Sequence, residues 1–254
     1  MSKSRIFSDA KQLQQIAKIL SAYMRLPFSG DSIPGALMEY VLAFVRGGEV
    51  LRTYDFVDVV DRKGKVGWQV KSTKDSTPVT WKRAKIPNAA KLIAGSRQSP
   101  EGIQTLGDQI ITFCNEHAKH SLDAYGLDEI GYSRLILTGK SVVYFERELC
   151  SRDNPRVFKA EDFAWRWSDP KVTKKKEQLS ALHGKHTPTG KKWFAWHGLG
   201  ENQLHFSGES EWWLLPSDER RVEFEFTGAD GRVDMEVFME LLNTLSKTSD
   251  VNVT

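Results

Sequence analysis

Two short runs of β-branched and aromatic residues, 56–60 and 66–70, flank a polar segment that contains one glycine. Strand-forming residues on both sides of a short polar segment predict a β-hairpin. A turn centred on Lys63-Gly64 pairs Asp61 with Val66. Because one such pair fixes the partner of every other residue along the two strands, the hairpin constrains any fold assigned to the chain.

The same register places Asp58 opposite Gln69. Side chains alternate along a strand, so Lys71 shares the face that carries Asp58 and Gln69. This face therefore gathers an acid, an amide and a lysine on strands that are otherwise apolar. A charged group on a half-buried sheet is costly unless it has a partner or a metal ion. The three residues are candidates for a functional site.

This cluster resembles the motif of a known family. An acid on one strand, followed on the next strand by an acid or amide, any residue and a lysine, is similar to the PD-(D/E)xK nuclease superfamily and, within it, to the type II restriction endonucleases. The matching residues are Asp58, Gln69 and Lys71. Glu39 fits the glutamate that family members often carry on the helix before the hairpin. The resemblance covers residues 31–86.

The sequence departs from the family pattern in two places. Val57 stands where the family has a proline before the acid, and Gln69 replaces the usual second acid, which makes the predicted site less anionic. An alternative register is also open, because a β-bulge that shifts the pairing would make Asp55 or Asp61 the family acid.

The resemblance implies a Mg²⁺-dependent phosphodiesterase. Asp58 and the backbone carbonyl of Val70 are expected to bind the ion, and Gln69 to supply an amide oxygen or hold a metal-bound water. Lys71 is expected to orient the attacking water, with Glu39 as a further catalytic carboxylate. Mg²⁺ is commonly held by one or two carboxylates with waters and substrate oxygens, so a sparse site suffices. Such an ion neutralises charge on the phosphate and acidifies a water.

Purely structural explanations compete with this one. Asp58 and Lys71 are also compatible with an exposed cross-strand ion pair, which contributes little to stability. Glu39 is compatible with an ion pair to Arg46 or Arg52 at the periphery of its helix. Both alternatives stay open at this point.

Composition sets broad limits on the class of protein. The chain has 254 residues and a net charge of +3, which is enough length for a sizeable core. Cys114 and Cys150 are too few and too far apart for a disulfide framework or a zinc knuckle, which favours a reducing compartment. No apolar run reaches membrane-spanning length, and residues 1–11 lack the apolar core of a secretory signal. Together with the resemblance, this predicts a cytoplasmic protein of a prokaryotic cell without a membrane partner.

Periodicity gives an order of elements for the whole chain. Helices are predicted over 8–26, 32–47, 99–122 and 234–245, and strands beyond the hairpin over 79–86, 134–138 and 141–145. The expected fold class is α/β (α+β), with a central mixed β-sheet flanked by helices and a β-meander that continues the hairpin. The second helix is apolar almost all round, which predicts burial on most sides.

The chain after residue 150 has a different composition. Residues 156–192 hold ten lysines or arginines against four acids, a net charge of +6, whereas residues 201–254 hold four against twelve, a net charge of −8. Six of the eight tryptophans lie between Trp165 and Trp213. A cationic, aromatic segment is typical of nucleic-acid contact. We therefore expect a catalytic core over 1–150 and, over 151–254, a β-rich recognition region with a C-terminal helix, integrated with the core.

Double-stranded DNA is the expected partner. The candidate contacts are Lys82, Arg166, Lys174, Lys175, Lys176, Lys191, Lys192, Asn202 and Gln203. Lysines would contact phosphates, which gives affinity without sequence choice, and Arg, Asn and Gln carry the paired groups that read bases. The alternatives are a solvated loop for the lysines and core packing for the tryptophans. The histidines at 183, 186, 197 and 205 are expected to contact DNA or cap turns, because no acid or cysteine completes a metal site.

These expectations combine into one function with two alternatives. The resemblance implies a type II restriction enzyme that acts as a homodimer on a short site, leaves 5′-phosphate and 3′-hydroxyl ends, and has a DNA methyltransferase as its genetic partner. A junction-resolving or repair nuclease would keep the fold and change the substrate. A non-catalytic DNA-binding protein on the same scaffold is the third possibility, which Gln69 keeps open.

Overall fold

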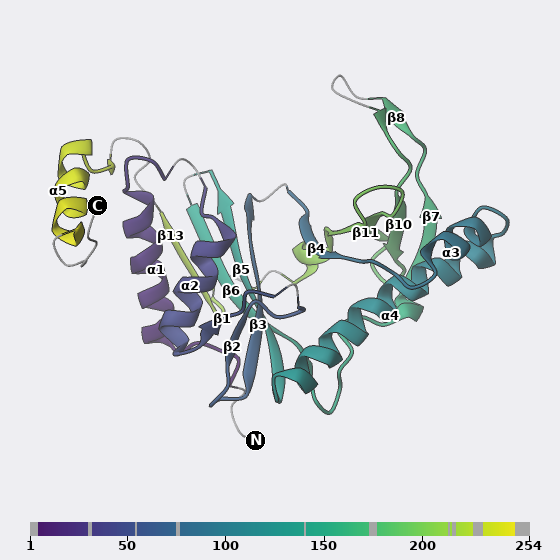
Figure 1. Cartoon of the computed structure of the whole chain (residues 1–254), viewed down its shortest axis with the longest axis horizontal. Coiled ribbons are helices and arrows are strands. Elements are labelled where there is room, and N and C mark those ends of the chain that lie inside the picture. The colour runs from purple at the N-terminus through teal and green to yellow at the C-terminus, as the bar shows by residue number, and fades with distance from the viewer. Residues whose placement is uncertain are drawn as a thin grey trace, which may run out of the picture.

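The computed structural model describes residues 5–29, 32–53, 55–74, 77–139, 141–172, 177–212, 214, 217–225 and 231–246. Two β-sheets and the helices packed on them make up this part of the chain (Figure 1). The predicted contacts Lys174, Lys175 and Lys176 lie outside the described residues.

The first sheet contains the predicted hairpin and is mixed. Its order is β1 (Glu49–Val50), β2 (Val59–Asp61), β3 (Val66–Lys74), β5 (Glu129–Thr138), β6 (Ser141–Ser151) and β13 (Arg221–Glu225). Strands β3 and β5 run parallel, and the other neighbours run antiparallel. Asp61 pairs with Val66, which confirms the predicted register of the hairpin.

Helices cover both faces of this sheet, as predicted for the fold class. Helices α1 (Ala10–Met24) and α2 (Gly35–Arg46) bury apolar side chains against Trp68 and Val70 of β3. The long helix α4 (Pro100–Ala124) packs on the opposite face, against Ile130 and Ile136 of β5. Figure 1 shows these helices on opposite sides of the sheet, and α3 (Ala89–Ser96) next to the start of α4.

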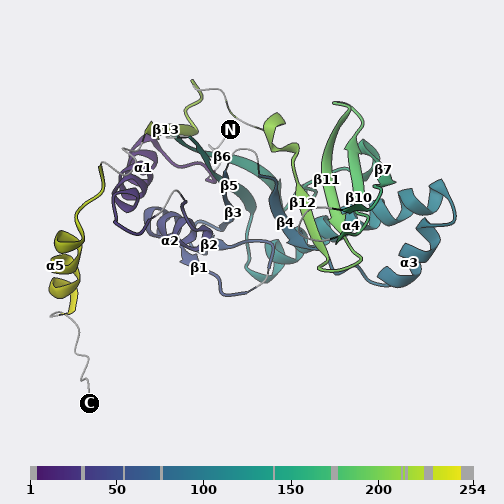
Figure 2. The ribbon, with the colours of Figure 1, turned by 90° about the horizontal axis from the view of Figure 1, so that it is seen from above.

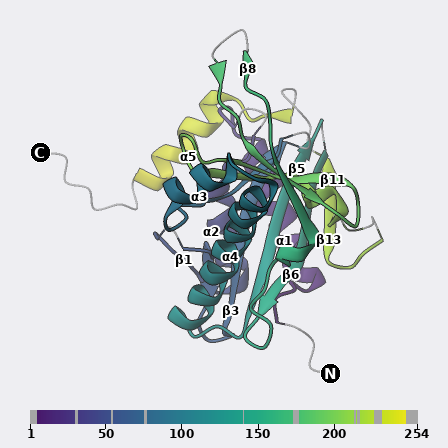
Figure 3. The same cartoon turned by 90° about the vertical axis from the view of Figure 1, so that its right-hand side faces the viewer.

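The second sheet is antiparallel and contains most of the tryptophan-rich region. Its order is β4 (Val79–Arg83), β12 (Gln203–Phe206), β11 (Lys191–His197), β10 (Leu182–His186) and β7 (Phe163–Trp167). One face packs on α4, where the ring of Trp165 lies so close to Gly107 that a Cβ atom there would be 2.2 Å from it. Two short 3₁₀ turns, η1 (Ala160–Asp162) and η2 (Gly208–Glu211), flank the sheet. A ribbon of β8 (Lys171–Val172) and β9 (Glu177–Gln178) projects beyond it (Figure 3).

The predicted β-meander is wrong, because the strand after the hairpin joins the other sheet. β4 pairs with β12 and is an edge strand of the second sheet. The chain leaves the first sheet at the end of β3, Lys74, and Pro78, which cannot donate a backbone hydrogen bond, directly precedes β4. Beyond it, Trp81 packs against the rings of Tyr132 in the first sheet and Phe206 in the second. The buried indole therefore joins the apolar cores of the two sheets.

Each sheet contains strands from both sides of residue 150. β4, from the N-terminal range, lies in the second sheet, and β13, from the C-terminal range, pairs with β6 in the first. The tryptophans Trp165, Trp193, Trp196 and Trp212 are buried, which confirms that core packing accounts for them. They belong to one apolar cluster with Trp81 and α4.

Helix α2 differs from its prediction in two ways. Its N-cap is Pro34, two positions after Ser32, where the predicted range begins, and it ends as expected at Gly47 in the left-handed conformation. It is not buried on most sides, since Tyr40 and Phe44 are 56% and 70% exposed. One stripe of the helix packs on the sheet and the aromatic stripe faces outward.

The final helix, α5 (Met235–Ser246), lies beyond α1 in Figures 1 and 2. It is attached through the Val233 N–H, which donates to the Arg25 carbonyl (2.9 Å), and through the rings of Phe238 and Phe28, 4.9 Å apart. Its apolar side chains are largely exposed at Met235, Val237, Met239, Leu241 and Leu242. Across the described ranges, no helix combines the length and apolarity needed to span a membrane.

Candidate active site

Asp58 lies one residue before β2 and holds the end of the hairpin with its side chain. Its N–H donates to the Trp68 carbonyl (2.8 Å), and its Oδ2 accepts a hydrogen bond from the Val70 N–H (2.7 Å). Val70 lies beyond the first residue of β2 and has no backbone partner on that strand. The Asp58 carboxylate accepts the hydrogen bond of its N–H instead. A buried N–H needs a partner, so this contact fixes the position of the acid.

The Val70 carbonyl is oriented toward the same side. In a strand, the N–H and C=O of one residue point to the same neighbour. The Val70 N–H points to Asp58, so its carbonyl also faces the edge of β3 beyond the start of β2. A carboxylate and a backbone carbonyl therefore border the same space.

Lys71 lies next to this acid. Its Nζ is 3.8 Å from Asp58 Oδ2, and the two side chains are only 20% and 25% exposed. The exposed ion pair considered from the sequence is therefore a partly buried one, with less solvent screening than a surface pair.

Glu39 brings a second carboxylate from α2, which packs against β1, β2 and β3. Burial raises the pKa of Glu39, the negative charge of Asp58 raises it further, and the charge of Lys71 lowers it. Glu39 therefore lies within the electrostatic reach of both site residues. Two carboxylates that repel each other beside one lysine form a site that an added cation would stabilise.

Gln69 is buried, at 2% exposure, and its amide is only partly satisfied. Its Nε2 donates to the Trp81 carbonyl of β4 (3.4 Å), whereas Oε1 has no hydrogen-bond partner among the described residues. A buried acceptor without a donor is unfavourable. This buried oxygen would be stabilised by a bound water or cation.

The alternative acids of the hairpin have other roles. Asp61 accepts a hydrogen bond from the Gly64 N–H (2.8 Å) and so closes the turn. Asp55 accepts a hydrogen bond from the Tyr125 hydroxyl, which lowers the pKa of Asp55. In the part of the chain that the structure describes, the ion pair of Lys71 is with Asp58.

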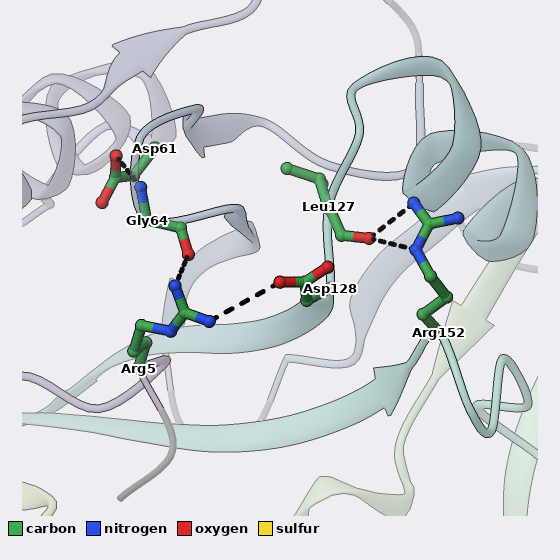
Figure 4. A network of polar contacts seen from close by, with 6 residues as sticks. All are labelled: Arg5, Asp61, Gly64, Leu127, Asp128 and Arg152. Atoms are coloured by element: carbon green, nitrogen blue, oxygen red, sulfur yellow. Dashed lines mark hydrogen bonds and ion pairs between the residues drawn. The ribbon is translucent and has the colours of Figure 1, made fainter. Parts of the chain in front are cut away.

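The turn of the hairpin is tied to the start of β5 (Figure 4). Arg5 donates to the Gly64 carbonyl (2.9 Å) and lies 3.6 Å from the Asp128 carboxylate. The Asp128 N–H donates to the Lys65 carbonyl (2.7 Å). These contacts hold the hairpin, and with it the site residues, in register with the parallel partner strand.

Lys82, predicted as a DNA contact, lies near the site. Burial lowers the pKa of Lys82, with opposing effects from Cys114, Asp55 and Asp58 and a further lowering by Lys71. The neighbouring Trp81 carbonyl accepts the hydrogen bond from Gln69. No sequence pattern predicts this proximity, because β4 reaches β3 from a different sheet.

The remaining predicted contacts are spread over the second sheet. Arg166 and Lys192 are exposed, while Lys191 forms an ion pair with Glu211 (2.5 Å). Gln203 Oε1 lies 3.0 Å from His205 Nε2. Asn202 adopts a positive φ of 54°, and its carbonyl accepts a hydrogen bond from the Ala84 N–H (2.8 Å). The structure therefore brings Glu39, Asp58, Gln69, Val70, Lys71 and Lys82 together, and the other candidates among the described residues lie elsewhere.

The residues around Asp58 fit a weakly coordinated cation. Among the described residues, no group of three His, Cys, Asp or Glu side chains is arranged to hold a metal ion. Asp58, Glu39, the open Gln69 oxygen and the Val70 carbonyl offer oxygen ligands only, which suits a hard ion such as Mg²⁺ whose other ligands are water and substrate. No family model, curated protein or solved structure matches the chain.

Proposed function

We propose that this protein is a Mg²⁺-dependent, sequence-specific endonuclease of double-stranded DNA, of the type II restriction kind and with a PD-(D/E)xK-like core. The observation that carries the proposal is the partly buried pair of Asp58 and Lys71 at the end of the hairpin, with Glu39 and the open acceptor of Gln69 beside it. A bare structural ion pair explains neither the second carboxylate nor the unsatisfied amide.

Each residue has a distinct role in this proposal. Asp58, the Gln69 amide oxygen and the Val70 carbonyl would hold Mg²⁺, with Glu39 nearby as a ligand or as the acceptor of a water proton. The ion supplies charge neutralisation at the phosphate and a more acidic water. Lys71 donates hydrogen bonds that orient the attacking water, and its positive charge stabilises the water after it loses its proton. The products are a 5′-phosphate and a 3′-hydroxyl.

The proposed assembly is a homodimer. Exposed apolar side chains at α5, and at Tyr40 and Phe44 of α2, support an interface with a second copy, because large apolar surfaces usually mark contacts. A dimer would place two sites on the two strands of a symmetric DNA sequence. A methyltransferase that protects the same sequence is the proposed genetic partner.

The test is incubation of the purified protein with plasmid DNA in Mg²⁺ or in EDTA, followed by electrophoresis and sequencing of the ends. Discrete fragments that require Mg²⁺ support the proposal. Nicking confined to branched DNA would contradict it in favour of a junction-resolving nuclease.

Gln69 favours one other candidate, a non-catalytic DNA-binding protein. It replaces an acid and is buried under the Trp81 carbonyl. Gln69→Glu separates the two, with Gln69→Met as a control of similar size. Cleavage gained only by the glutamate variant would identify a site that has lost its activity, whereas cleavage by the unaltered protein excludes that candidate.

A further inference from the structure

The outer face of the second sheet carries a row of five paired residues, one on each strand, and four of them are polar. Arg166 pairs with His183, His183 with Ala195, Ala195 with His205, and His205 with Thr80. Directly paired residues place their side chains on the same face. The opposite face is the buried one, and Figure 2 shows α3 and α4 on that side.

This face is hollowed where its side chains are small. Ala195 lies between the histidines of the row, in a hollow that His183, Lys192, His197, His205 and Ser207 also line. A second hollow, lined by Arg166, Lys185 and Gly190, shares His183 and Lys192 with the first. The two hollows therefore form one surface, which we name the histidine face.

The histidine face is cationic. Arg166, Lys185 and Lys192 carry permanent positive charge, and the acid that lines these hollows is Asp169. Lys191, which directly precedes Lys192 on β11, forms an ion pair with Glu211 and lines neither hollow. A concave surface with positive charge and hydroxyl donors suits a phosphate backbone.

The histidine face begins at the strand that borders the active site. Thr80 of β4 lies in the row beside His205, while the next residue on β4, Trp81, contacts Gln69 through its carbonyl. One short strand thus links the two places. A long, stiff polyanion can contact both at once, whereas a small anion cannot.

We propose that the histidine face binds the phosphate backbone of duplex DNA and positions it without reading its sequence. The identity of this ligand rests on the function proposed above. Gln203, the nearest amide able to read a base, already contacts His205 through its Oε1. The guanidinium of Arg166 pairs equally well with phosphate oxygens, so the cationic and hydroxyl groups of this face suit contacts to the backbone.

The histidines make this contact sensitive to pH. The rings of His197 and His205 are 5.0 Å apart, and burial lowers the pKa of both, with a further lowering by the nearby Lys192 and an opposing effect from Glu201. His183 faces His205 across Ala195, and Gln203 is hydrogen bonded to His205. A bound phosphate favours the protonated rings, so DNA binding takes up protons and strengthens as the pH falls.

The test is the affinity for a labelled duplex of arbitrary sequence, measured in EDTA over a range of salt concentrations. We expect Arg166→Ala/Lys192→Ala to lower the affinity at least about tenfold and to reduce the slope of log affinity against log salt by about 2. The matched control is Lys119→Ala/Arg156→Ala, which removes two charges near α4, on the other side of the sheet. An unchanged affinity and slope in the first variant, with its melting temperature intact, would overturn the proposal.

A second variant tests the histidines without removing a permanent charge. The unaltered protein is expected to bind the duplex more tightly at about pH 5.5 than at about pH 7.5, and His197→Gln/His205→Gln is expected to flatten this dependence. A dependence that survives the double variant would contradict the role of the histidine pair. Because no metal is present, these measurements are independent of cleavage, which tests the proposed function separately.

Discussion

The Oδ2 atom of Asp58 accepts a hydrogen bond of 2.7 Å from the Val70 N–H, at the point where β2 no longer accompanies β3. The contact holds a carboxylate beside a backbone carbonyl and 3.8 Å from Lys71 Nζ. The same end of the hairpin thus combines a fixed acid, a free edge of backbone and a lysine. This combination is the basis of the proposed metal site.

Loss of the lysine is expected to separate catalysis from binding. Lys71→Ala should lower the rate of DNA cleavage by about a hundredfold or more, because the group that orients the attacking water is removed. Affinity for DNA in EDTA should change little. The control is Lys63→Ala, which removes an exposed lysine from the turn of the same hairpin. Retained cleavage in Lys71→Ala would exclude this lysine from the mechanism.

Glu39 is expected to decrease stability in the absence of a cation. Burial and Asp58 raise the pKa of Glu39 above its ordinary value of 4.5. The stabilising contribution of a group with a raised pKa is present below the ordinary pKa and is lost as the pH rises through the folded-state pKa. Without metal, the melting temperature of Glu39→Gln at neutral pH should therefore exceed that of the unaltered protein. In acid, where Glu39 is protonated, the two proteins should melt at the same temperature.

Mg²⁺ should reverse this order at neutral pH, because only in the unaltered protein does a second carboxylate, in addition to Asp58, face the ion. Thermal melting with and without Mg²⁺ measures both effects, and Glu116→Gln, an exposed change on α4, is the control. Identical melting curves for Glu39→Gln and the unaltered protein under all conditions would contradict the placement of Glu39 in the site.

The N-terminal segment is anchored by a buried acid on β6. Glu146 is fully buried and accepts hydrogen bonds from the Ser8 N–H (2.5 Å), the Ser8 hydroxyl (2.7 Å) and the Tyr144 hydroxyl (2.6 Å). Burial raises the pKa of Glu146 and these hydrogen bonds lower it. Glu146→Ala leaves the donors without partners and should reduce the free energy of unfolding by about 2–4 kcal/mol.

Chemical denaturation measures this loss. Ser8→Ala removes one of the three donors and should cost about 1 kcal/mol, which separates the network from a general effect of substitution. If Glu146→Ala lowers the free energy of unfolding by less than Ser8→Ala does, the network does not stabilise the fold.

The exposed apolar residues of α5 predict a concentration-dependent dimer. Leu241→Glu/Leu242→Glu should give a monomer where the unaltered protein has the mass of two chains in light scattering. Glu236→Gln/Glu240→Gln changes the same helix without touching its leucines and should remain dimeric. A monomeric unaltered protein would contradict the proposed dimer and leave the site unaffected.

Elements formed by residues close together in the chain could be predicted from the sequence. The hairpin register follows from one turn and the alternation of side chains, so the alignment of Asp61 with Val66, and from it the place of Asp58, could be predicted. Helix α1 was predicted over 8–26 and runs over Ala10–Met24, where Asp9 forms a capping box with Gln12 at its start.

Non-local pairing could not be predicted in the same way. The partner of β4 is β12, more than a hundred residues later, and no short motif encodes that choice. Lys82 and the Trp81 carbonyl reach the site only because of it. The aromatic periodicity of α2 was equally ambiguous, because an apolar residue such as Phe44 can face the core or another molecule.

Cleavage of plasmid DNA by Asp58→Asn and by Asp61→Asn, compared in Mg²⁺ under single-turnover conditions, tests the central claim most directly. Both substitutions remove an acid from the same hairpin, but Asp61 closes the turn whereas Asp58 borders the proposed cation site. We predict Mg²⁺-dependent cleavage by the unaltered protein, near-normal cleavage by Asp61→Asn, and a rate reduced about a hundredfold or more for Asp58→Asn. Equal rates for Asp58→Asn and the unaltered protein would contradict the site proposed here.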